Sequence, residues 1–416
     1  MKIKANREYI GEFQIPGDKS ITHRAILFNG MAEGKAEISG ALLGEDCLSS
    51  LSCMQKLGAK AEISGDTILM EGCKKFRSGQ TLDCGNSGTT MRLMMGLLAG
   101  KHCEAVLTGD ASLSKRPMER VAEPLRKLGA KIDTVEGHAP VSVFESDLTG
   151  RELDTAVASA QVKSALILAA LGAEGGTRIF EKLKTRDHTE RLLGAMGADI
   201  KVEENSVIVR KSSLHAVSVE VPGDISSAAY FMVLGALCGE TLSKNVDINP
   251  TRTGIFTVFD RMGVNYTLEN IRESGGEPVA DVRVKKSRLK PLRLGAEDMP
   301  SLIDEVPVIS VLCAFADGES VISGAEELKV KESDRIKTTA EMLCSAGVDV
   351  QAKPDGFIIR GGKKVCGGKI CSYADHRIAM SGAVLLTASE QGGEIEGAEC
   401  VNISFPGFFE LLSREK

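Results

Sequence analysis

Apolar and polar positions follow one pattern that recurs six times along the chain. A polar residue is followed by a turn of small residues, a helix that is apolar on nearly all sides, and then glycine and a short β-rich segment. A helix with no polar face is typical of a buried element, so each copy predicts an internal helix. The copies begin at Asp18, Asn86, Ser159, Asp224, Asp304 and Asp375, residue types that favour helix N-caps.

Most copies continue into a strand, a second, amphipathic helix, and a glycine turn into another strand. The turns are Gly58-Ala59-Lys60, Gly129-Ala130-Lys131, Gly197-Ala198-Asp199, Gly263-Val264-Asn265 and Gly347-Val348-Asp349. Each unit therefore predicts the order βαβαββ. The sixth unit ends early, at "SFPGFFELLSREK", whereas residues 1–16 form a strand segment with no helix before it. We expect the N-terminus to supply the strands that the sixth unit lacks.

This arrangement predicts an α/β protein with helices buried inside sheets and two domains of three units each. We expect one domain over 17–222 and the other over 1–16 and 223–416. The chain would cross between them near Pro16-Gly17 and Pro222-Gly223, because Pro-Gly pairs are turn signals. Two adjacent crossings are a natural hinge.

Cations lie beside the predicted helix starts, where the helix dipole disfavours positive charge unless an anion is bound there. They are Lys19, Arg24, Arg92 and Arg377, with Arg116, Arg186, Lys331 and Arg335 in the loops before the second helices. Taken singly, each could be a solvated surface charge, but their equivalent positions favour a phosphate or carboxylate site. Asp304 and Glu332 are acid–base candidates, although Asp304 could be a plain N-cap and Glu332 an ordinary charge partner.

Composition narrows the function classes further. The 416 residues carry a net charge of −6, so no bulk attraction to nucleic acid or anionic lipid is expected. The eleven cysteines include no CxxC pair, which favours reduced thiols over zinc or disulfides. No apolar run approaches the ~20 residues of a membrane span, and a cytoplasmic location is expected. Motifs for nucleotide cofactors or metal hydrolysis are absent from the sequence.

The motifs "PGDKSITHRA", "GNSGTTMR", "SKRPMERV", "SAQVKSAL", "VKESDRI", "DHRIAM" and "SFPGFFELL" together resemble the 5-enolpyruvylshikimate-3-phosphate synthase family, from end to end and in order. The resemblance implies an inside-out α/β barrel with two domains of three repeats. It implies transfer of the enolpyruvyl group of phosphoenolpyruvate to the 5-hydroxyl of shikimate 3-phosphate, in the shikimate route to aromatic amino acids. It also implies domain closure, a monomer, and no metal or organic cofactor.

The same resemblance implies residue roles. Shikimate 3-phosphate is expected at Lys19, Ser20, Arg24, Ser159, Ala160, Gln161, Thr185, Asp304 and Lys331. Phosphoenolpyruvate is expected at Lys19, Gly88, Arg116, Gln161, Arg335 and Arg377. By analogy, Asp304 would orient or deprotonate the 5-hydroxyl, while Glu332 and Lys19 would handle protonation of the methylene carbon.

Several positions depart from the commoner family pattern. His188 stands where many members have an aromatic hydroxyl, Glu327 where many have Asn, Ala160 where many have a second Ser, and Leu93 where many have Pro. A Lys that many members place before the last Phe-Pro pair is also absent. These changes resemble the second, often glyphosate-tolerant, subclass. Gly88 is nevertheless retained where many tolerant members have Ala, so the sequence leaves inhibition by glyphosate open.

Three other functions are weighed against this one. A UDP-N-acetylglucosamine enolpyruvyl transferase would show Lys-Asn in place of Lys19-Ser20 and a reactive Cys where Ala111 stands. A non-catalytic anion-binding relative would lack the acid–base groups Asp304, Glu332 and Lys19. A nucleic-acid end-processing enzyme of similar repeat architecture would need a broad basic surface, which the net charge disfavours.

Overall fold

The computed structural model describes residues 1–155 and 158–414, and the chain divides into two compact units. The N-terminal unit comprises Gly17–Val221 and Ser274–Glu277; the C-terminal unit comprises Met1–Pro16, Pro222–Glu273 and Pro278–Lys416. The predicted domains were 17–222 and 1–16 with 223–416, so these units differ from them at Pro222 and at the segment 274–277. Its backbone packs on that of Glu220, since a Cβ on Gly275 would lie 2.4 Å from the Glu220 carbonyl oxygen.

The N-terminal unit contains three four-stranded sheets within its described residues, ordered β14–β3–β5–β4, β6–β7–β9–β8 and β10–β11–β13–β12. Its helices are α1 (Lys19–Met31), α2 (Glu45–Leu57), α3 (Gly88–Gly100), α4 (Glu119–Lys127), α5 (Ala160–Ala170) and α6 (His188–Ala195), with a 3₁₀ turn at Leu113–Lys115. Its strands are β3 (Lys35–Ser39), β4 (Lys60–Ser64), β5 (Thr67–Glu71), β6 (Gln80–Asp83), β7 (Ala105–Thr108), β8 (Lys131–Val135), β9 (His138–Phe144), β10 (Glu152–Asp154), β11 (Gly176–Phe180), β12 (Ile200–Val202), β13 (Ser206–Arg210) and β14 (Val219–Glu220).

In the described part of the C-terminal unit the sheet orders are β16–β17–β15–β2, β18–β19–β21–β20 and β1–β23–β22. The helices are α7 (Ile225–Cys238), α8 (Gly254–Met262), α9 (Val306–Phe315), α10 (Arg335–Ser345), α11 (His376–Ala388) and α12 (Phe408–Leu412), with 3₁₀ turns at Met299–Ser301, Glu326–Val330 and Ala398–Ile403. The strands are β1 (Lys2–Ile3), β2 (Ile10–Gln14), β15 (Glu240–Asp247), β16 (Asn265–Ser274), β17 (Glu277–Lys285), β18 (Arg293–Leu294), β19 (Glu319–Ile322), β20 (Asp349–Lys353), β21 (Gly356–Arg360), β22 (Gly368–Cys371) and β23 (Gly393–Glu396).

The repeats share one sheet topology. In the second repeat β6 is parallel to β7, which is antiparallel to β9, and β9 is antiparallel to β8. The third and fifth repeats have the same order. The glycine turns that end the second helices all adopt positive φ, the left-handed conformation that glycine allows without a Cβ clash. They are Gly58, Gly129, Gly197, Gly263 and Gly347, with φ between 76° and 118°. The βαβαββ prediction is confirmed.

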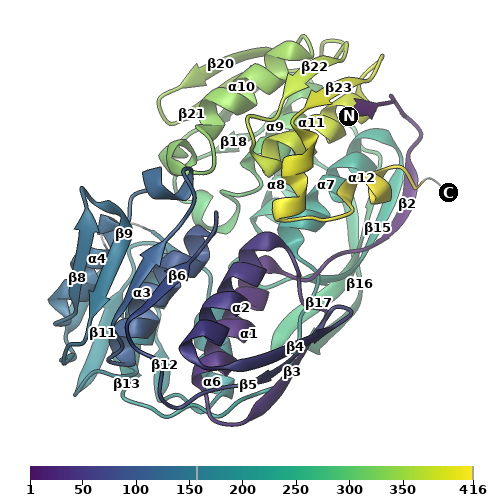
Figure 1. Cartoon of the computed structure of the whole chain (residues 1–416). Helices are drawn as coiled ribbons and strands as arrows, with labels where there is room; N and C mark the ends of the chain where they lie inside the picture. The colour runs from purple at the N-terminus through teal and green to yellow at the C-terminus, as the bar shows by residue number, and fades with distance from the viewer. Residues whose placement is uncertain (156–157, 415–416) are drawn as a thin grey trace. The chain divides into compact units, whose positions relative to one another are not determined.

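Short strands from distant parts of the chain complete the repeats next to the crossings. β14 is parallel to β3 and provides the first strand of the first repeat. β2 is parallel to β15 and provides the first strand of the fourth, as the purple and teal strands of Figure 1 show. β1 joins β23 of the sixth repeat. The expected supply of strands to the sixth unit is thus confirmed for β1 and wrong for β2.

The first helix of each repeat is buried on nearly all sides, as its sequence predicts. In α3 and α5 the backbones touch, because a Cβ on Gly96 would lie only 2.0 Å from the carbonyl oxygen of Ala165. The strands alternate buried and exposed residues, as in β2 and β9. This confirms the α/β class and the inside-out arrangement of sheets around helices. None of the sheets formed by the described residues closes on itself as a barrel. No described helix combines the length and apolarity needed to traverse a bilayer.

Candidate anion-binding active site

The N-terminal ends of the internal helices carry most of the predicted site residues, and their caps place them. The predicted caps Asp18, Ser159, Asp224 and Asp375 are confirmed, each accepting a hydrogen bond from a backbone N–H in the first turn. The other two predictions are wrong by one residue. Ser87 rather than Asn86 caps α3, and α9 begins after Glu305 rather than Asp304. Both displaced side chains are therefore available for contacts with cations.

Lys19 and Arg24 lie on α1 in the N-terminal unit. The Lys19 ammonium pairs with the Asp46 carboxylate and is largely buried. Arg24 is 2% exposed, and its Nε donates to the Thr189 hydroxyl at 2.7 Å. A second Arg24 nitrogen donates to the Ser164 hydroxyl at 2.9 Å. These contacts fix both cations at the helix start, where the partial positive charge of the backbone adds to theirs.

Ser20 and Arg186 meet at the same end of α1. One guanidinium nitrogen of Arg186 lies 3.4 Å from the Ser20 hydroxyl oxygen. The Ser20 carbonyl accepts a hydrogen bond of 2.9 Å from Arg24. The Ser20 hydroxyl accepts from Arg186 and keeps its proton, so it is a suitable donor to a phosphate oxygen.

A second group of cations surrounds the start of α3. Arg92 donates to the Gln161 amide oxygen at 2.6 Å, and Arg116 donates to the Asn86 amide oxygen at 2.6 Å. Gly88 lies between the two guanidinium groups: a Cβ there would be 3.1 Å from an Arg92 nitrogen and 3.3 Å from an Arg116 nitrogen. Glycine at this position therefore keeps the space between two cations open, and any side chain would reduce it.

Gln161 connects this group to the start of α5. Its amide nitrogen donates to the Thr89 hydroxyl at 2.9 Å, so both ends of the amide are held by residues of α3. Ser159 caps α5 through a 3.5 Å hydrogen bond from the Val162 N–H, and Ala160 is the first helical residue. Ala160 offers no side-chain donor, so only its backbone could contact a ligand.

Thr185 lies before α6 and is turned toward a buried ionic cluster. Its hydroxyl donates to Glu181 at 2.5 Å, which leaves only its lone pairs for a ligand. Lys163 pairs with Glu181 at 3.1 Å and with Glu190 at 2.6 Å, and donates to the Thr185 carbonyl. Burial raises the pKa of Glu190, and the charge and hydrogen bond of Lys163 oppose that shift. Lys163 was not among the predicted site residues, although a lysine within an apolar helix requires buried partners.

In the C-terminal unit, Asp304 lies in the loop before α9 and faces cations from two later elements. Its Oδ1 accepts a hydrogen bond of 3.2 Å from Lys331 and lies 3.6 Å from an Arg335 nitrogen. Its backbone carbonyl accepts a hydrogen bond of 3.0 Å from Arg377. Burial alone would lower the pKa of Arg377, but the negative charge of Asp304 raises it. Asp304, which by residue type could have been an N-cap, is therefore part of a cluster of charged side chains.

Arg335 is the centre of that cluster. It is 1% exposed, and its guanidinium binds both Asp375 oxygens, at 2.8 Å and 3.2 Å, and Glu332 at 2.5 Å. Burial would lower the pKa of Arg335, but Asp375 and Glu332 raise it, so the cation is permanent. Asp375 also accepts the Arg377 backbone N–H at 2.9 Å and therefore has two structural tasks. Its role as the partner of Arg335 was not apparent from its sequence position.

His188, a departure from the commoner family pattern, is the first residue of α6 and is buried against Glu277, the first residue of β17. Its Nδ1 lies 2.7 Å from a Glu277 oxygen, and the second oxygen of Glu277 lies 3.6 Å from Arg191. Asp187, His188 and Glu277 could each offer one ligand atom to a metal ion, and these three atoms lie within 4.8 Å of one another. Arg191 sits against two of these carboxylates, with Asp187 at 3.0 Å, so the cluster is built as a network of ion pairs.

The predicted residues therefore divide between the two units, at or near helix starts, and the two sets are named here the N-terminal group and the C-terminal group. The N-terminal group contains Lys19, Ser20, Arg24, Gly88, Arg116, Ser159, Ala160, Gln161 and Thr185. The C-terminal group contains Asp304, Lys331, Glu332, Arg335 and Arg377. Both groups suit anionic oxygen-rich ligands, and the C-terminal one adds two carboxylates that can exchange protons.

Comparison with known proteins identifies the relatives of this fold. The family described as EPSP synthase (3-phosphoshikimate 1-carboxyvinyltransferase) matches residues 3–412. The 3-phosphoshikimate 1-carboxyvinyltransferase of Alkaliphilus metalliredigens is 45% identical over 409 residues, covering 97% of this chain and 96% of that protein. The EPSP synthase structure from Acinetobacter baumannii has a TM-score of 0.87 at 43% identity, covering 100% of this chain and 97% of that one. The enolpyruvyl transferase NikO from Streptomyces tendae shares the fold, with a TM-score of 0.79 at 17% identity over 99% of this chain and 96% of that one.

Proposed function

Because the chain belongs to the EPSP synthase (3-phosphoshikimate 1-carboxyvinyltransferase) family, we propose that it transfers the enolpyruvyl group of phosphoenolpyruvate to the 5-hydroxyl of shikimate 3-phosphate. The products are 5-enolpyruvylshikimate 3-phosphate and inorganic phosphate. The observation that carries the proposal is the match over residues 3–412, which includes every cation and carboxylate described above. The reaction belongs to the shikimate route to aromatic amino acids.

We assign the acceptor, shikimate 3-phosphate, to one set of polar groups. They are Lys19, Ser20, Arg24, Ser159, Ala160, Gln161, Thr185, Asp304 and Lys331. The 3-phosphate is a dianion, and the fixed guanidinium of Arg24 with the Ser20 hydroxyl supports a phosphate subsite there. The Thr185 hydroxyl donates its proton to Glu181. Thr185 would therefore bind the acceptor by accepting a hydrogen bond from one of its hydroxyl groups or through its own backbone.

We assign the donor, phosphoenolpyruvate, to Lys19, Gly88, Arg116, Gln161, Arg335 and Arg377. The open space at Gly88 between two guanidinium groups supports a phosphate position, because only glycine leaves it free. Arg335 and Arg377 are permanently charged and suit the carboxylate. Such groups stabilise charge that develops on the donor during the reaction.

The reaction needs proton transfer in two stages. Asp304 orients or deprotonates the 5-hydroxyl as its oxygen bonds to C2 of phosphoenolpyruvate, while Glu332 and Lys19 deliver a proton to the methylene carbon. The methyl group then returns a proton as the bond between C2 and the phosphate oxygen breaks. Overall, the 5-hydroxyl proton leaves with phosphate. Asp304 is suited to its role because Lys331 holds its carboxylate at 3.2 Å.

Phosphate release tests the proposal directly. Purified protein is incubated with phosphoenolpyruvate and no added metal, with shikimate 3-phosphate in one reaction and UDP-N-acetylglucosamine in another. Release with shikimate 3-phosphate alone is expected. Release with UDP-N-acetylglucosamine alone would overturn the choice of acceptor. Silence in both reactions, from protein with a cooperative thermal transition, would overturn the activity and favour a non-catalytic anion-binding protein.

The remaining features of the proposal concern the whole protein. We expect a monomer that acts in the cytoplasm without a metal or organic cofactor, on small molecules rather than nucleic acid or membranes. Glyphosate is a phosphonate with a carboxylate, so its charges match those of the donor subsite. Retained Gly88 supports inhibition, because it keeps the phosphate position open.

A further inference from the structure

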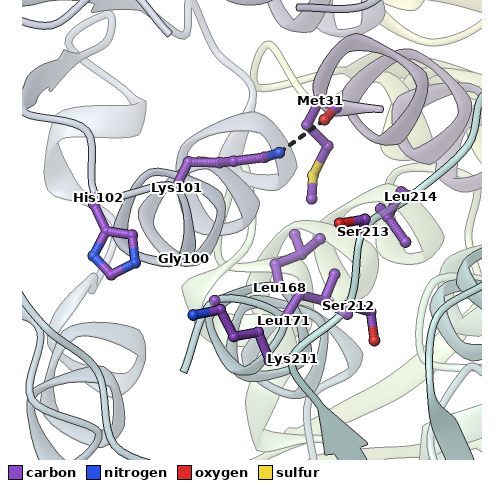
Figure 2. Close-up of a pocket in the computed structure, with 11 residues that line it drawn as sticks. Met31, Gly100, Lys101, His102, Leu168, Leu171, Lys211, Ser212, Ser213 and Leu214 are labelled. Atoms are coloured by element: carbon purple, nitrogen blue, oxygen red, sulfur yellow. Dashed lines mark hydrogen bonds between the residues drawn. The ribbon is translucent and has the colours of Figure 1, made fainter. Parts of the chain in front are cut away.

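The internal helices of the N-terminal unit end at a cavity of ≈ 350 Å³. Met31 lines it from α1, Gly100–His102 from the end of α3, Leu168 from α5, Leu171 and Gly172 from just after α5, and residues 211–214 from the segment after β13 (Figure 2). The predicted site residues on or beside α1, α3 and α5 lie at the opposite ends of those helices. A 13-residue helix such as α1 is about 20 Å long, so the cavity is separate from the anion site.

The cavity has an apolar and rigid floor. Leu168, Leu171 and Leu214 line it, each at most 6% exposed, and Figure 2 shows the Met31 thioether directed toward the same space. The floor cannot collapse easily, because α3 and α5 meet backbone to backbone there. A Cβ on Gly172 would lie 1.9 Å from the carbonyl oxygen of Gly100. The volume falls at the lower end of the range for small-molecule sites, roughly 300–1,000 Å³.

One ammonium group at this cavity is uncompensated by a carboxylate. Lys101 donates to the Met31 carbonyl oxygen at 2.9 Å, as the dashed line in Figure 2 shows. Burial lowers the pKa of Lys101. Within the described residues, no carboxylate oxygen lies within ion-pair distance of it. The second lysine at the cavity, Lys211, is paired with Glu174 outside the lining. The Lys101 ammonium, which also lies 5.9 Å from the centroid of the Phe76 ring, is therefore the charge that we expect a ligand to meet.

Other backbone carbonyls at this end of the unit have backbone donors of their own. The Leu97 and Ala99 carbonyls of α3 accept hydrogen bonds from the backbone N–H groups of Lys101 and His102, at 3.0 Å and 3.2 Å. At the end of α5, the Leu171 carbonyl accepts the Ser212 N–H at 3.1 Å. Apart from the Met31 carbonyl, these acceptors are occupied, and the lining combines an apolar floor with a partly desolvated cation.

We propose that this cavity is an accessory binding site for a small monocarboxylate with an apolar body. The carboxylate would pair with Lys101, and the apolar body would cover Leu168, Leu171 and Met31. An ion pair formed in a partly desolvated setting is stronger than one in water, and the cavity is too small for a dinucleotide or a lipid chain with its headgroup. The site concerns neither substrate of the proposed reaction, so its test does not depend on that reaction.

Benzoate and benzamide form a matched pair of probes, because they share a ring and differ in charge. Protein labelled at the methionine methyl groups is titrated with each, and the Met31 signal is identified from a Met31→Leu variant. We expect benzoate to shift the Met31 signal saturably and at least about tenfold more tightly than benzamide, because the ion pair is charge-assisted. Equal affinities for both probes, or no shift with benzoate, would overturn the proposal.

Lys101→Met tests the cation itself. The variant should bind benzoate at least about tenfold more weakly, whereas Lys35→Met, which removes an exposed lysine of the same unit, should bind it normally. Since Lys101→Met also removes a donor to the Met31 carbonyl, Ser213→Phe provides a second variant that fills the exposed mouth and keeps the charge. It should also lose benzoate binding. The rate of phosphate release without benzoate should be unchanged in all three variants. Normal benzoate binding by both cavity variants would contradict the site.

Discussion

At the scale of single residues, the predicted site is a set of charges held by opposite charges. Asp46 holds Lys19, Lys331 holds Asp304, and Glu332 and Asp375 hold Arg335. Each group is fixed before a ligand arrives, which lowers the reorganisation that a reaction would require. The arrangement also limits what can be inferred from one residue, because removing a charge leaves its partner buried and uncompensated.

For Glu332, a loss of proton transfer can be separated from a loss of charge pairing with Arg335. Glu332→Gln keeps the size and one hydrogen-bond acceptor for Arg335, but it cannot exchange a proton near neutral pH. We expect kcat for phosphate release to fall by roughly a hundredfold or more, with shikimate 3-phosphate affinity within a few-fold of wild type. Steady-state kinetics and equilibrium titration measure the two effects separately.

Glu326→Gln is the matched control, because Glu326 is an exposed carboxylate in the same segment. It should leave both quantities unchanged. Unchanged turnover in Glu332→Gln would remove Glu332 from proton transfer. A joint loss of turnover and acceptor affinity would instead mean that its charge organises Arg335.

The role of a site residue could be predicted from sequence where its place beside a helix start decides that role. It could not be predicted where the role depends on a partner from elsewhere in the chain. Cations beside helix starts are visible as a pattern, and Arg24, Arg116 and Arg335 are indeed held there. Asp46 is different, since nothing local indicates that its carboxylate reaches Lys19. The only available signal for such pairs is a charged residue in an apolar helix, as at Lys163.

At the scale of elements, the caps show how a displacement of one residue changes function. Asp304 was a credible N-cap by residue type, but α9 starts at Val306, a position where the proline at its second residue is compatible with the first helical turn. Asp304 therefore remains in the loop, where it can meet Lys331. Helix ends are the least certain part of any sequence-based prediction, and here the error decides between a structural and a chemical role.

Asp375 joins two elements, because it caps α11 and binds Arg335 of α10. Asparagine is as good a cap as aspartate but has no charge for Arg335. We expect Asp375→Asn to lower the free energy of unfolding by about 3–5 kcal/mol at neutral pH, the typical cost of breaking a buried ion pair. Asp334→Asn, at the exposed cap of α10, should change it by less than about 0.5 kcal/mol. Denaturant unfolding monitored by circular dichroism measures both.

The effect of Asp375→Asn should depend on pH in one direction. Burial alone would raise the pKa of Asp375, but the charge of Arg335 holds it below its usual range. The stabilising contribution is therefore complete above the pKa of an unfolded aspartate, about 3.9, and is lost as the pH falls through the lower pKa of the folded state. The gap between wild type and variant should narrow below about pH 4. A gap that stays constant to lower pH would mean that packing, not charge, causes the loss.

At the scale of the whole molecule, the position of a strand along the chain does not decide which unit the strand belongs to. The six repeats could be counted from hydrophobic periodicity, because each internal helix is a local pattern. The pairing of β14 with β3 and of β2 with β15 could not be predicted. Short strands pair through backbone hydrogen bonds, which do not depend on side-chain identity and can join residues far apart in the chain. Segment 274–277 escapes prediction for the same reason.

The pairing of β2 with β15 has a measurable consequence for local stability. Phe13, on β2, is 1% exposed and stacks on Phe231 of α7, with ring centroids 4.1 Å apart, whereas Phe28 is buried in the core of the N-terminal unit. Each Phe→Ala change should cost about 3–5 kcal/mol. In native-state hydrogen exchange resolved by peptides, Phe13→Ala should accelerate exchange in β15 and α7 but not in α2 or β3, although residue 13 is closer in sequence to the latter. Phe28→Ala should give the reverse pattern. If both variants accelerated exchange equally in both units, the two would unfold as one cooperative body, and membership of β2 would have no separate effect on stability.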